Sequence, residues 1–168
     1  MTARRGVFVS IGIVAVSTAV VVVTALATPS AGIVSATVVA RASFKDQVDL
    51  KFKLKGDHNE VIHAPEARDT VVQQIVIAPG GTTGWHSHHG PAVAMIAAGE
   101  LTLYSSEDPT CTPRTYSAGE AFIDPGQGHV HIAFNLGSED VEIWVTYFDV
   151  PPGGSVRVDA ASPGNCGF

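Results

Sequence analysis

The feature that most constrains the fold is an alternation of short β-type runs with turn clusters, at intervals of about ten residues past residue 31. In the clearest run, 141–148, every second residue from Val141 to Tyr147 is apolar. Gly- and Pro-rich clusters such as 79–84 and 125–128 separate the runs. Outside the N-terminal segment no window shows the 3.6-residue period of a helix. The pattern therefore predicts an all-β domain, either a sandwich or a barrel.

The strand prediction covers nine segments. They are Thr37–Ala42, Val48–Leu54, Thr70–Ala78, Ala92–Ala98, Leu101–Ser105, Arg114–Tyr116, Glu120–Ile123, Val130–Phe134 and Val141–Phe148. His58 and His63 are assigned to a polar, solvated loop between the second and third of these segments.

Residues 1–31 are typical of an export segment. Two arginines near the start precede an uncharged stretch, Gly6–Ala27, that is dominated by Val, Ile and Ala. Small residues at Ala25 and Ala27 predict cleavage of a signal peptide near residues 27–31; an uncleaved transmembrane anchor is the alternative, because the run is long enough to span a bilayer. In both cases the folded domain is expected outside the cytoplasm, secreted or in the cell envelope, with membrane contact only through this segment.

The charge balance argues against one class of partner. Ten Lys and Arg stand against sixteen Asp and Glu, which gives a formal net charge of −6. An acidic surface repels phosphate backbones, and the sequence has no basic run interleaved with aromatic residues. We therefore expect no nucleic-acid binding.

Both cysteines, Cys111 and Cys166, lie in the part of the chain that we expect to be exported. An even count in an oxidising compartment predicts a disulfide. A redox or metal-binding pair is the alternative, but the Cys-x-x-Cys spacing expected of such sites is absent.

The chemistry of the chain is concentrated in its histidines. Five of the seven fall in two clusters, at 86–89 and 129–131. Residues two apart on a strand project to the same face, so His86 and His88 form one pair of neighbours, and His129 and His131 another. Neutral imidazole is a ligand for zinc, iron, copper and nickel, and two such pairs facing one interior predict a metal pocket.

Two glycine–histidine spacings enclose these pairs. The first is Gly, five residues, His-x-His, then Glu and Gly; it is matched by Gly80, His86, His88 and Gly99, but Ala92 stands in the Glu position. The second is Gly, five residues, Pro-x-Gly, two residues, His, three residues, Asn; it is matched by Gly119, Pro125, Gly128, His131 and Asn135, with one extra residue between Pro125 and Gly128. With these motifs the chain resembles the cupin family, and in particular small secreted actinobacterial cupin-domain proteins.

The resemblance implies a jelly-roll-like β-barrel of two antiparallel sheets over residues 33–168. It also implies a divalent transition metal, iron, manganese, zinc, copper or nickel, held by His86, His88 and His131, with no ligand at Ala92. His129 is an alternative or additional ligand, because strict alternation places it on the face of His131 unless the extra turn residue forms a bulge. His89 has the opposite parity from His86 and is expected to face solvent.

Two classes of function fit this site. One is a metal-binding barrel of the cell envelope that takes a small-molecule ligand; the other is a metal-dependent oxygenase or isomerase that uses three histidines. The missing glutamate, with no recognisable acid/base carboxylate near the motifs, favours the first. Trp144 and Phe148 form a second apolar face on the last strand, which predicts a possible homodimer contact.

Overall fold

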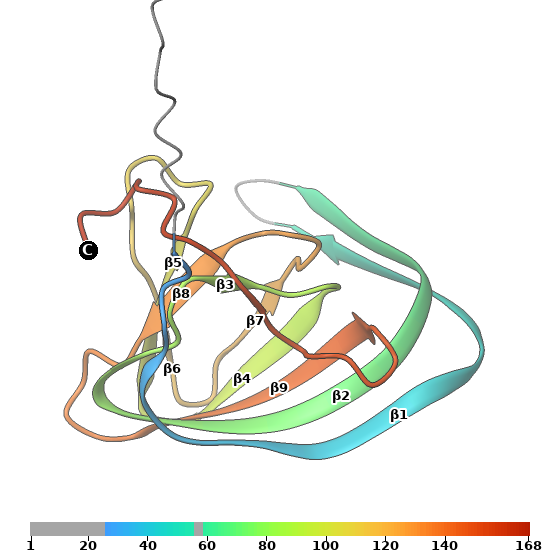
Figure 1. Cartoon of the computed structure of the whole chain (residues 1–168), viewed down its shortest axis with the longest axis horizontal. Coiled ribbons are helices and arrows are strands. Elements are labelled where there is room, and N and C mark those ends of the chain that lie inside the picture. Colours follow the sequence, from blue (N-terminus) through green and yellow to red (C-terminus); the bar gives the residue numbers. More distant parts are fainter. Residues whose placement is uncertain (1–25, 56–58) are drawn as a thin grey trace, which may run out of the picture.

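The computed structural model describes residues 26–55 and 59–168, and in these ranges it consists of strands, turns and loops (Figure 1). The strands are β1 (Ala31–Leu54), β2 (Glu60–Thr82), β3 (His86–Ser87), β4 (Ala92–Ala98), β5 (Glu100–Ser105), β6 (Arg114–Ser117), β7 (Ala121–Asp124), β8 (His131–Phe134), β9 (Val141–Val150) and β10 (Val158–Asp159). Most of the expected export segment, residues 1–25, lies outside the described residues. Among the described residues, no helix has the length and apolar character needed to cross a membrane.

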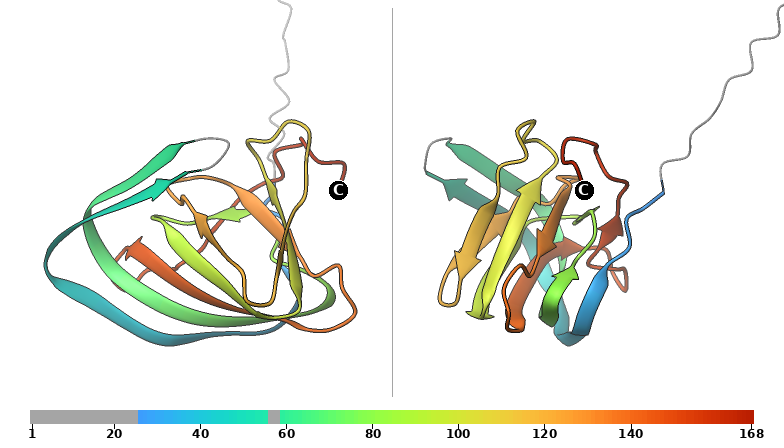
Figure 2. Two further views of the ribbon diagram at one scale, coloured as in Figure 1. Left: turned by 180° about the vertical axis from the view of Figure 1, so that it is seen from behind. Right: turned by 90° about the vertical axis from the view of Figure 1, so that its left-hand side faces the viewer.

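The strands form a nearly closed antiparallel barrel, which confirms the predicted fold class. One half has the order β1-β2-β9-β4-β7, and the other half has the order β10-β3-β8-β5-β6. The two halves join where β2 pairs with β8, at Thr82 and Phe134. Figure 2 shows the two halves curving around a common interior.

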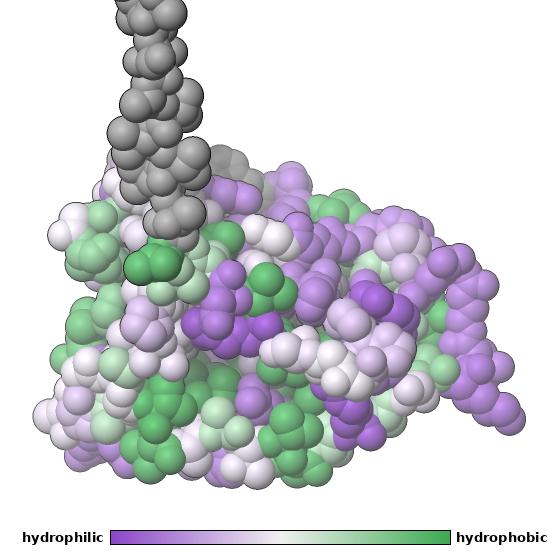
Figure 3. Space-filling view, viewed as in Figure 1, coloured by the Kyte–Doolittle hydropathy of each residue, from purple (hydrophilic) through white to green (hydrophobic). Residues whose placement is uncertain are grey.

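The first part of the structure corrects two predictions. Thr37–Ala42 and Val48–Leu54 belong to one strand, β1, and a register shift between Ser43 and Val48 marks the irregular stretch that separates them. The polar segment that contains His63 is part of β2, where His63 pairs with Lys51, while His58 lies outside the described residues. Ile62 and Ala64 are buried at this end of the hairpin and alternate with exposed residues, but the polar residues and Pro65 around them hide this pattern in the sequence. Hydrophilic side chains cover that end of the molecule in Figure 3.

The later strands lie close to their predicted bounds, and β9 shows why. Along β9 the apolar residues Val141, Ile143, Val145 and Tyr147 are buried, while the residues between them are half-buried. They form the core together with residues of β2, β4 and β5. On the other face of β9, Phe148 packs on Phe52 of β1, with ring centroids 5.7 Å apart. The homodimer contact at this face stays a prediction.

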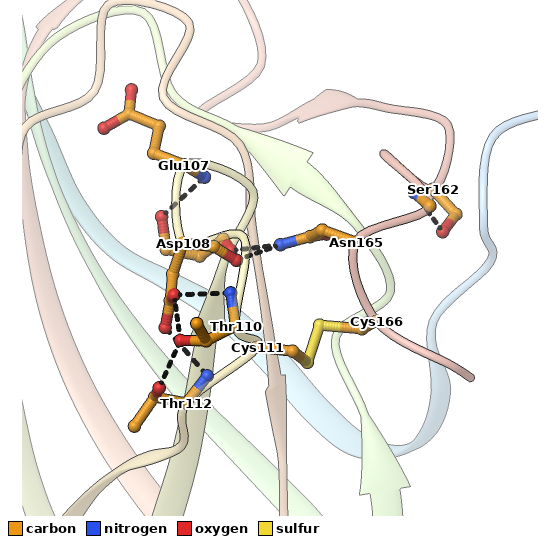
Figure 4. Close-up of a disulfide and its surroundings, with 10 residues drawn as sticks. Glu107, Asp108, Thr110, Cys111, Thr112, Ser162, Asn165 and Cys166 are labelled. Atoms are coloured by element: carbon orange, nitrogen blue, oxygen red, sulfur yellow. Dashed lines mark hydrogen bonds between the residues drawn. A yellow bond between two sulfur atoms is a disulfide. The ribbon is translucent and has the colours of Figure 1, made fainter.

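A disulfide joins Cys111 to Cys166 and confirms the predicted pairing; their Cα atoms are 5.3 Å apart (Figure 4). Beside it, the side-chain amide of Asn165 donates hydrogen bonds to the carbonyls of Ser105 and Asp108, at 2.9 and 2.7 Å. The C-terminal segment is therefore held against the loop that follows β5 by one covalent and two hydrogen bonds.

The turn before β8 contains the extra residue of the second motif. Gly126, Gln127 and Gly128 all have positive φ angles, of 63°, 55° and 90°. These three consecutive left-handed residues accommodate the insertion in the turn, so that β8 begins at His131 and His129 stays in the turn.

We expect the two glycines of this turn to respond differently to alanine. A Cβ at Gly126 would collide with the carbonyl oxygen of Gly90, whereas a Cβ at Gly128 would meet open space. Gly128→Ala should therefore lower the free energy of unfolding by only about 1 kcal/mol, for backbone strain, and Gly126→Ala by about 3 kcal/mol, because overpacking is added. Urea unfolding of the two variants measures the difference, and equal losses would contradict the predicted clash.

Candidate metal centre

Three histidines from the two predicted pairs converge inside the barrel. His86 on β3 lies opposite His131 on β8, and His88 follows two residues after His86. All three are buried, with 6%, 7% and 4% of their surface exposed for His86, His88 and His131. Each offers one ring nitrogen, and these three atoms lie within 4.8 Å of one another.

Two of the rings are fixed through the nitrogen that faces away from the cluster. Nδ1 of His86 lies 2.8 Å from the carbonyl oxygen of Gly84, and Nδ1 of His88 lies 2.6 Å from that of Val156. A ring nitrogen this close to a carbonyl carries the proton and donates it, which leaves Nε2 unprotonated and free to bind a metal.

The third ring, that of His131, contacts a carboxylate. Oδ2 of Asp124, the last residue of β7, lies 2.7 Å from Nδ1 of His131. The angle at the ring N–H does not meet that of a hydrogen bond, so this nitrogen has no hydrogen-bond partner. The other oxygen, Oδ1, accepts a hydrogen bond from the N–H of Gly126 at 2.6 Å. Burial by itself would raise the pKa of Asp124, but His129 and His131 outweigh it and hold the pKa well below its usual range. Asp124 is therefore a buried anion beside the histidine cluster.

The remaining sequence candidates are placed differently. His129 sits in the turn before β8, where its Nε2 is 3.0 Å from the Ser105 hydroxyl and its Nδ1 is 3.9 Å from Asp124. It forms a second group with Asp124 and His131 rather than part of the three-histidine cluster. His89 is exposed, as expected from its parity. Ala92 is buried and offers no ligand atom.

A small cavity of about 50 Å³ adjoins the cluster, with room for a few water-sized groups. His86, His88, His131 and Asp124 line one part of it, and the rest is mostly apolar. Tyr147 also lines it, but its hydroxyl donates to Gln73 at 3.1 Å, and burial raises its pKa. The polar groups of the cavity thus converge on the histidine cluster.

The donor set fits a divalent transition metal. Burial, and then the neighbouring His131 ring, lowers the pKa of His86 to about 2 and that of His88 to about 4, so both rings are neutral near pH 7. Neutral imidazole is the form that binds a metal. Ligand atoms around one tetrahedral zinc stand about 3.4 Å apart at the usual bond lengths, which small side-chain movements from the present spacing can reach.

The same shifts predict that the metal-free protein loses stability in weak acid. The folded pKa values of His86 and His88 lie below the unfolded value of 6.5, so only the unfolded chain takes up protons as the pH falls through 6.5. Each histidine contributes about 1.4 kcal/mol per pH unit down to its folded pKa. Because the unfolded histidines are only half protonated at pH 6.5, the free energy of unfolding should fall by about 3 kcal/mol between pH 6.5 and 5, measured by urea unfolding with a chelator present.

A variant with His86→Gln and His88→Gln is the control for this pH dependence. His129 has a raised pKa and Asp124 a lowered one, so both keep their charge in the folded protein between pH 6.5 and 5 and add little to the slope. The variant should be nearly flat over this interval. A slope as steep as that of the wild type would show that other groups cause the acid sensitivity.

Two parts of the site were missed by sequence reasoning. Asp124 ends an otherwise apolar strand directly before Pro125. This single acidic residue is the one feature of the sequence that points to a carboxylate at the site. The carbonyl of Val156 comes from the C-terminal segment, which pairs with β3 through β10, and a two-residue strand leaves no periodic pattern.

The chain is similar to known proteins in the part that contains the histidine cluster. The Cupin domain family model matches residues 73–151, which contain both histidine pairs. A structure of recombinant oxalate oxidase in complex with glycolate is 28% identical, with a TM-score of 0.42, over 48% of this chain, and the match covers only 41% of the oxalate oxidase chain. A double-stranded β-helix protein from Klebsiella pneumoniae is 24% identical, with a TM-score of 0.44, over 55% of this chain and 76% of its own.

A polyketide cyclase from Streptomyces resistomycificus is 18% identical, with a TM-score of 0.43, over 49% of this chain and 56% of its own. A search of curated proteins finds no match to the chain. The family-model match runs from within β2 to the end of β9, includes both histidine pairs, and agrees with the antiparallel barrel. Residues 73–151 of the chain therefore form a cupin domain.

Proposed function

We propose that the chain is an exported single-domain cupin that holds a divalent transition metal at His86, His88 and His131 and binds a small molecule there. The observation that carries the proposal is the cluster of three buried ring nitrogens within 4.8 Å of one another. The Nδ1 contacts of His86 and His88 support it, because they aim the other nitrogen of each ring at the cluster.

The ligand that we propose is small and carries an oxygen anion. A divalent ion held by three neutral imidazoles, with the Asp124 carboxylate beside them, keeps a net positive charge at the site. Three protein ligands would leave room for a further ligand, and a metal held by them would supply a Lewis acid that polarises an oxygen atom. The cavity of about 50 Å³ limits the ligand to a few non-hydrogen atoms.

Binding is favoured over catalysis by the state of the other ionisable groups. Apart from the histidines, Asp124 and Tyr147 are the described residues of the cavity lining that can exchange a proton. Asp124 is held by Gly126 and His131, and the Tyr147 hydroxyl donates to Gln73. Neither is free to act as a general acid or base on a ligand.

Export is proposed from two features. The described disulfide is compatible with an oxidising compartment, where such bonds persist. The basic start and the apolar stretch of residues 1–31 have the pattern of a signal peptide or anchor.

Calorimetric titration of chelator-treated, disulfide-bonded protein with zinc tests the metal site. We expect one equivalent of zinc to bind, and acetate to bind the zinc-loaded protein but not the metal-free protein. Absence of saturable zinc binding would overturn the metal site, and equal binding of acetate to both forms would overturn its role in holding the ligand. Iron or manganese in protein isolated from its native compartment would favour the oxygenase alternative.

A further inference from the structure

We propose that Asp124 is the carboxylate of this metal centre, acting as a positioning residue that holds His131 through Nδ1 and directs its Nε2 to the metal. The inference rests on the proposed metal site. The first motif has lost its glutamate at Ala92 on β4, and the inference assigns the negative charge of the site to Asp124 on β7 instead.

The strand register places Asp124 beside the missing glutamate. β4 and β7 are antiparallel, and Ala92 lies directly opposite Asp124. Side chains of directly opposed residues share one face of a sheet, with Cβ atoms about 5 Å apart. Both residues line the cavity. A carboxylate from β7 thus enters the space next to the position where the motif has lost its own.

The contacts of the carboxylate direct it mainly at His131, since Nδ1 of His129 is farther away, at 3.9 Å. Asp124 is 4% exposed, and its Oδ1 is already occupied by the N–H of Gly126. Its Oδ2 faces Nδ1 of His131 at 2.7 Å, and that buried nitrogen has no hydrogen-bond partner. The separation is already that of a hydrogen bond, so rotation of the ring is enough to align the N–H with the oxygen.

The three rings are then held in the same way. Nδ1 of His86 faces a carbonyl oxygen, Nδ1 of His88 faces another, and Nδ1 of His131 faces the carboxylate. A carboxylate on the outer nitrogen fixes the tautomer, orients the ring and makes the inner nitrogen a stronger ligand. His131 is the only one of the three with a charged partner on this nitrogen, so we expect it to depend most on that partner.

Calorimetric zinc titration of Asp124 variants tests the role. Asp124→Ala should weaken zinc binding about 10- to 100-fold, the usual effect of losing an outer-sphere partner. Asp124→Asn keeps the shape, but its one amide oxygen can accept from only one of the Gly126 and His131 N–H groups while its amide nitrogen faces the other, so zinc binding should be weakened at least as much. Glu107→Gln is the control, since it removes an exposed charge 3.6 Å from His129 Nε2 and should leave zinc affinity unchanged.

Nitrogen NMR of the zinc-loaded wild type gives a second readout that does not depend on how the variants fold. The His131 ring of the wild type should show a proton on Nδ1 and zinc on Nε2. Zinc on Nδ1 of His131, or wild-type zinc affinity in folded Asp124→Asn and Asp124→Ala, would overturn the inference while leaving the metal site intact. A wild type that binds no zinc would overturn the metal site itself.

Discussion

Zinc is expected to raise the melting temperature of the wild-type protein by roughly 10 °C and to leave His86→Ala, His88→Ala and His131→Ala almost unchanged. A metal that binds only the folded state, at 1,000 times its dissociation constant, stabilises that state by about 4 kcal/mol. For a domain of this size each kcal/mol shifts the melting temperature by roughly 3 °C. Each of the three buried rings supplies one of the clustered nitrogens, so the loss of any one should remove most of the effect.

Two neighbouring histidines serve as controls in the same thermal-shift experiment. His89→Ala should keep the full zinc effect, because His89 is exposed and outside the cluster. His129→Ala decides between three ligands and four, since a loss as large as that of His131→Ala would make His129 a ligand. Its contact with Ser105 leads us to expect a smaller loss. Equal zinc effects in the wild type and in every variant would contradict the metal site.

Removing the disulfide is expected to have a similarly large effect. The bond closes a loop over a sequence separation of 55 residues. On the chain-entropy model such a loop stabilises the folded state by about 4 kcal/mol, so replacing Cys111 and Cys166 by serine should lower the melting temperature by on the order of 10 °C. Ser162→Ala, an exposed change in the same C-terminal segment, is the control and should leave it unchanged.

The same double variant should also bind zinc more weakly. The C-terminal segment supplies the Val156 carbonyl that holds His88, and β10 pairs with β3 at His86. A loosened segment holds both rings less firmly, and we expect about a 10-fold loss of affinity, the lower limit for an outer-sphere partner. Calorimetry with zinc measures it. Wild-type affinity in the double variant would show that the segment holds the ligands without the disulfide.

The barrel was largely predictable because its strands are half-buried. The side chains of β4 and β9 alternate between the core and the outer face, so the sequence shows a two-residue apolar period. β4, Ala92–Ala98, has the predicted bounds. The outer end of the β1–β2 hairpin buries Ile62 and Ala64 outside the main core cluster, and the polar residues around them hide the alternation in the sequence. The sequence therefore split β1 into two and assigned the start of β2 to a loop.

The site was predictable only where neighbours in the sequence are also neighbours in space. The two-residue spacing of His86 and His88, and the motif around His131, located the three clustered rings. Asp124 comes beside Ala92 through the register of β4 with β7, which no local pattern encodes. The sequence thus indicated a site without a carboxylate, whereas the structure places one 2.7 Å from His131.

The most direct test of the metal site is a crystal structure of the zinc-loaded protein, with anomalous diffraction measured at the zinc absorption edge. A three-histidine site predicts one strong anomalous peak inside the barrel, bonded to a nitrogen of His86, His88 and His131 at about 2.0–2.1 Å. A peak at exposed histidines such as His63 or His89, with none inside the barrel, would contradict it.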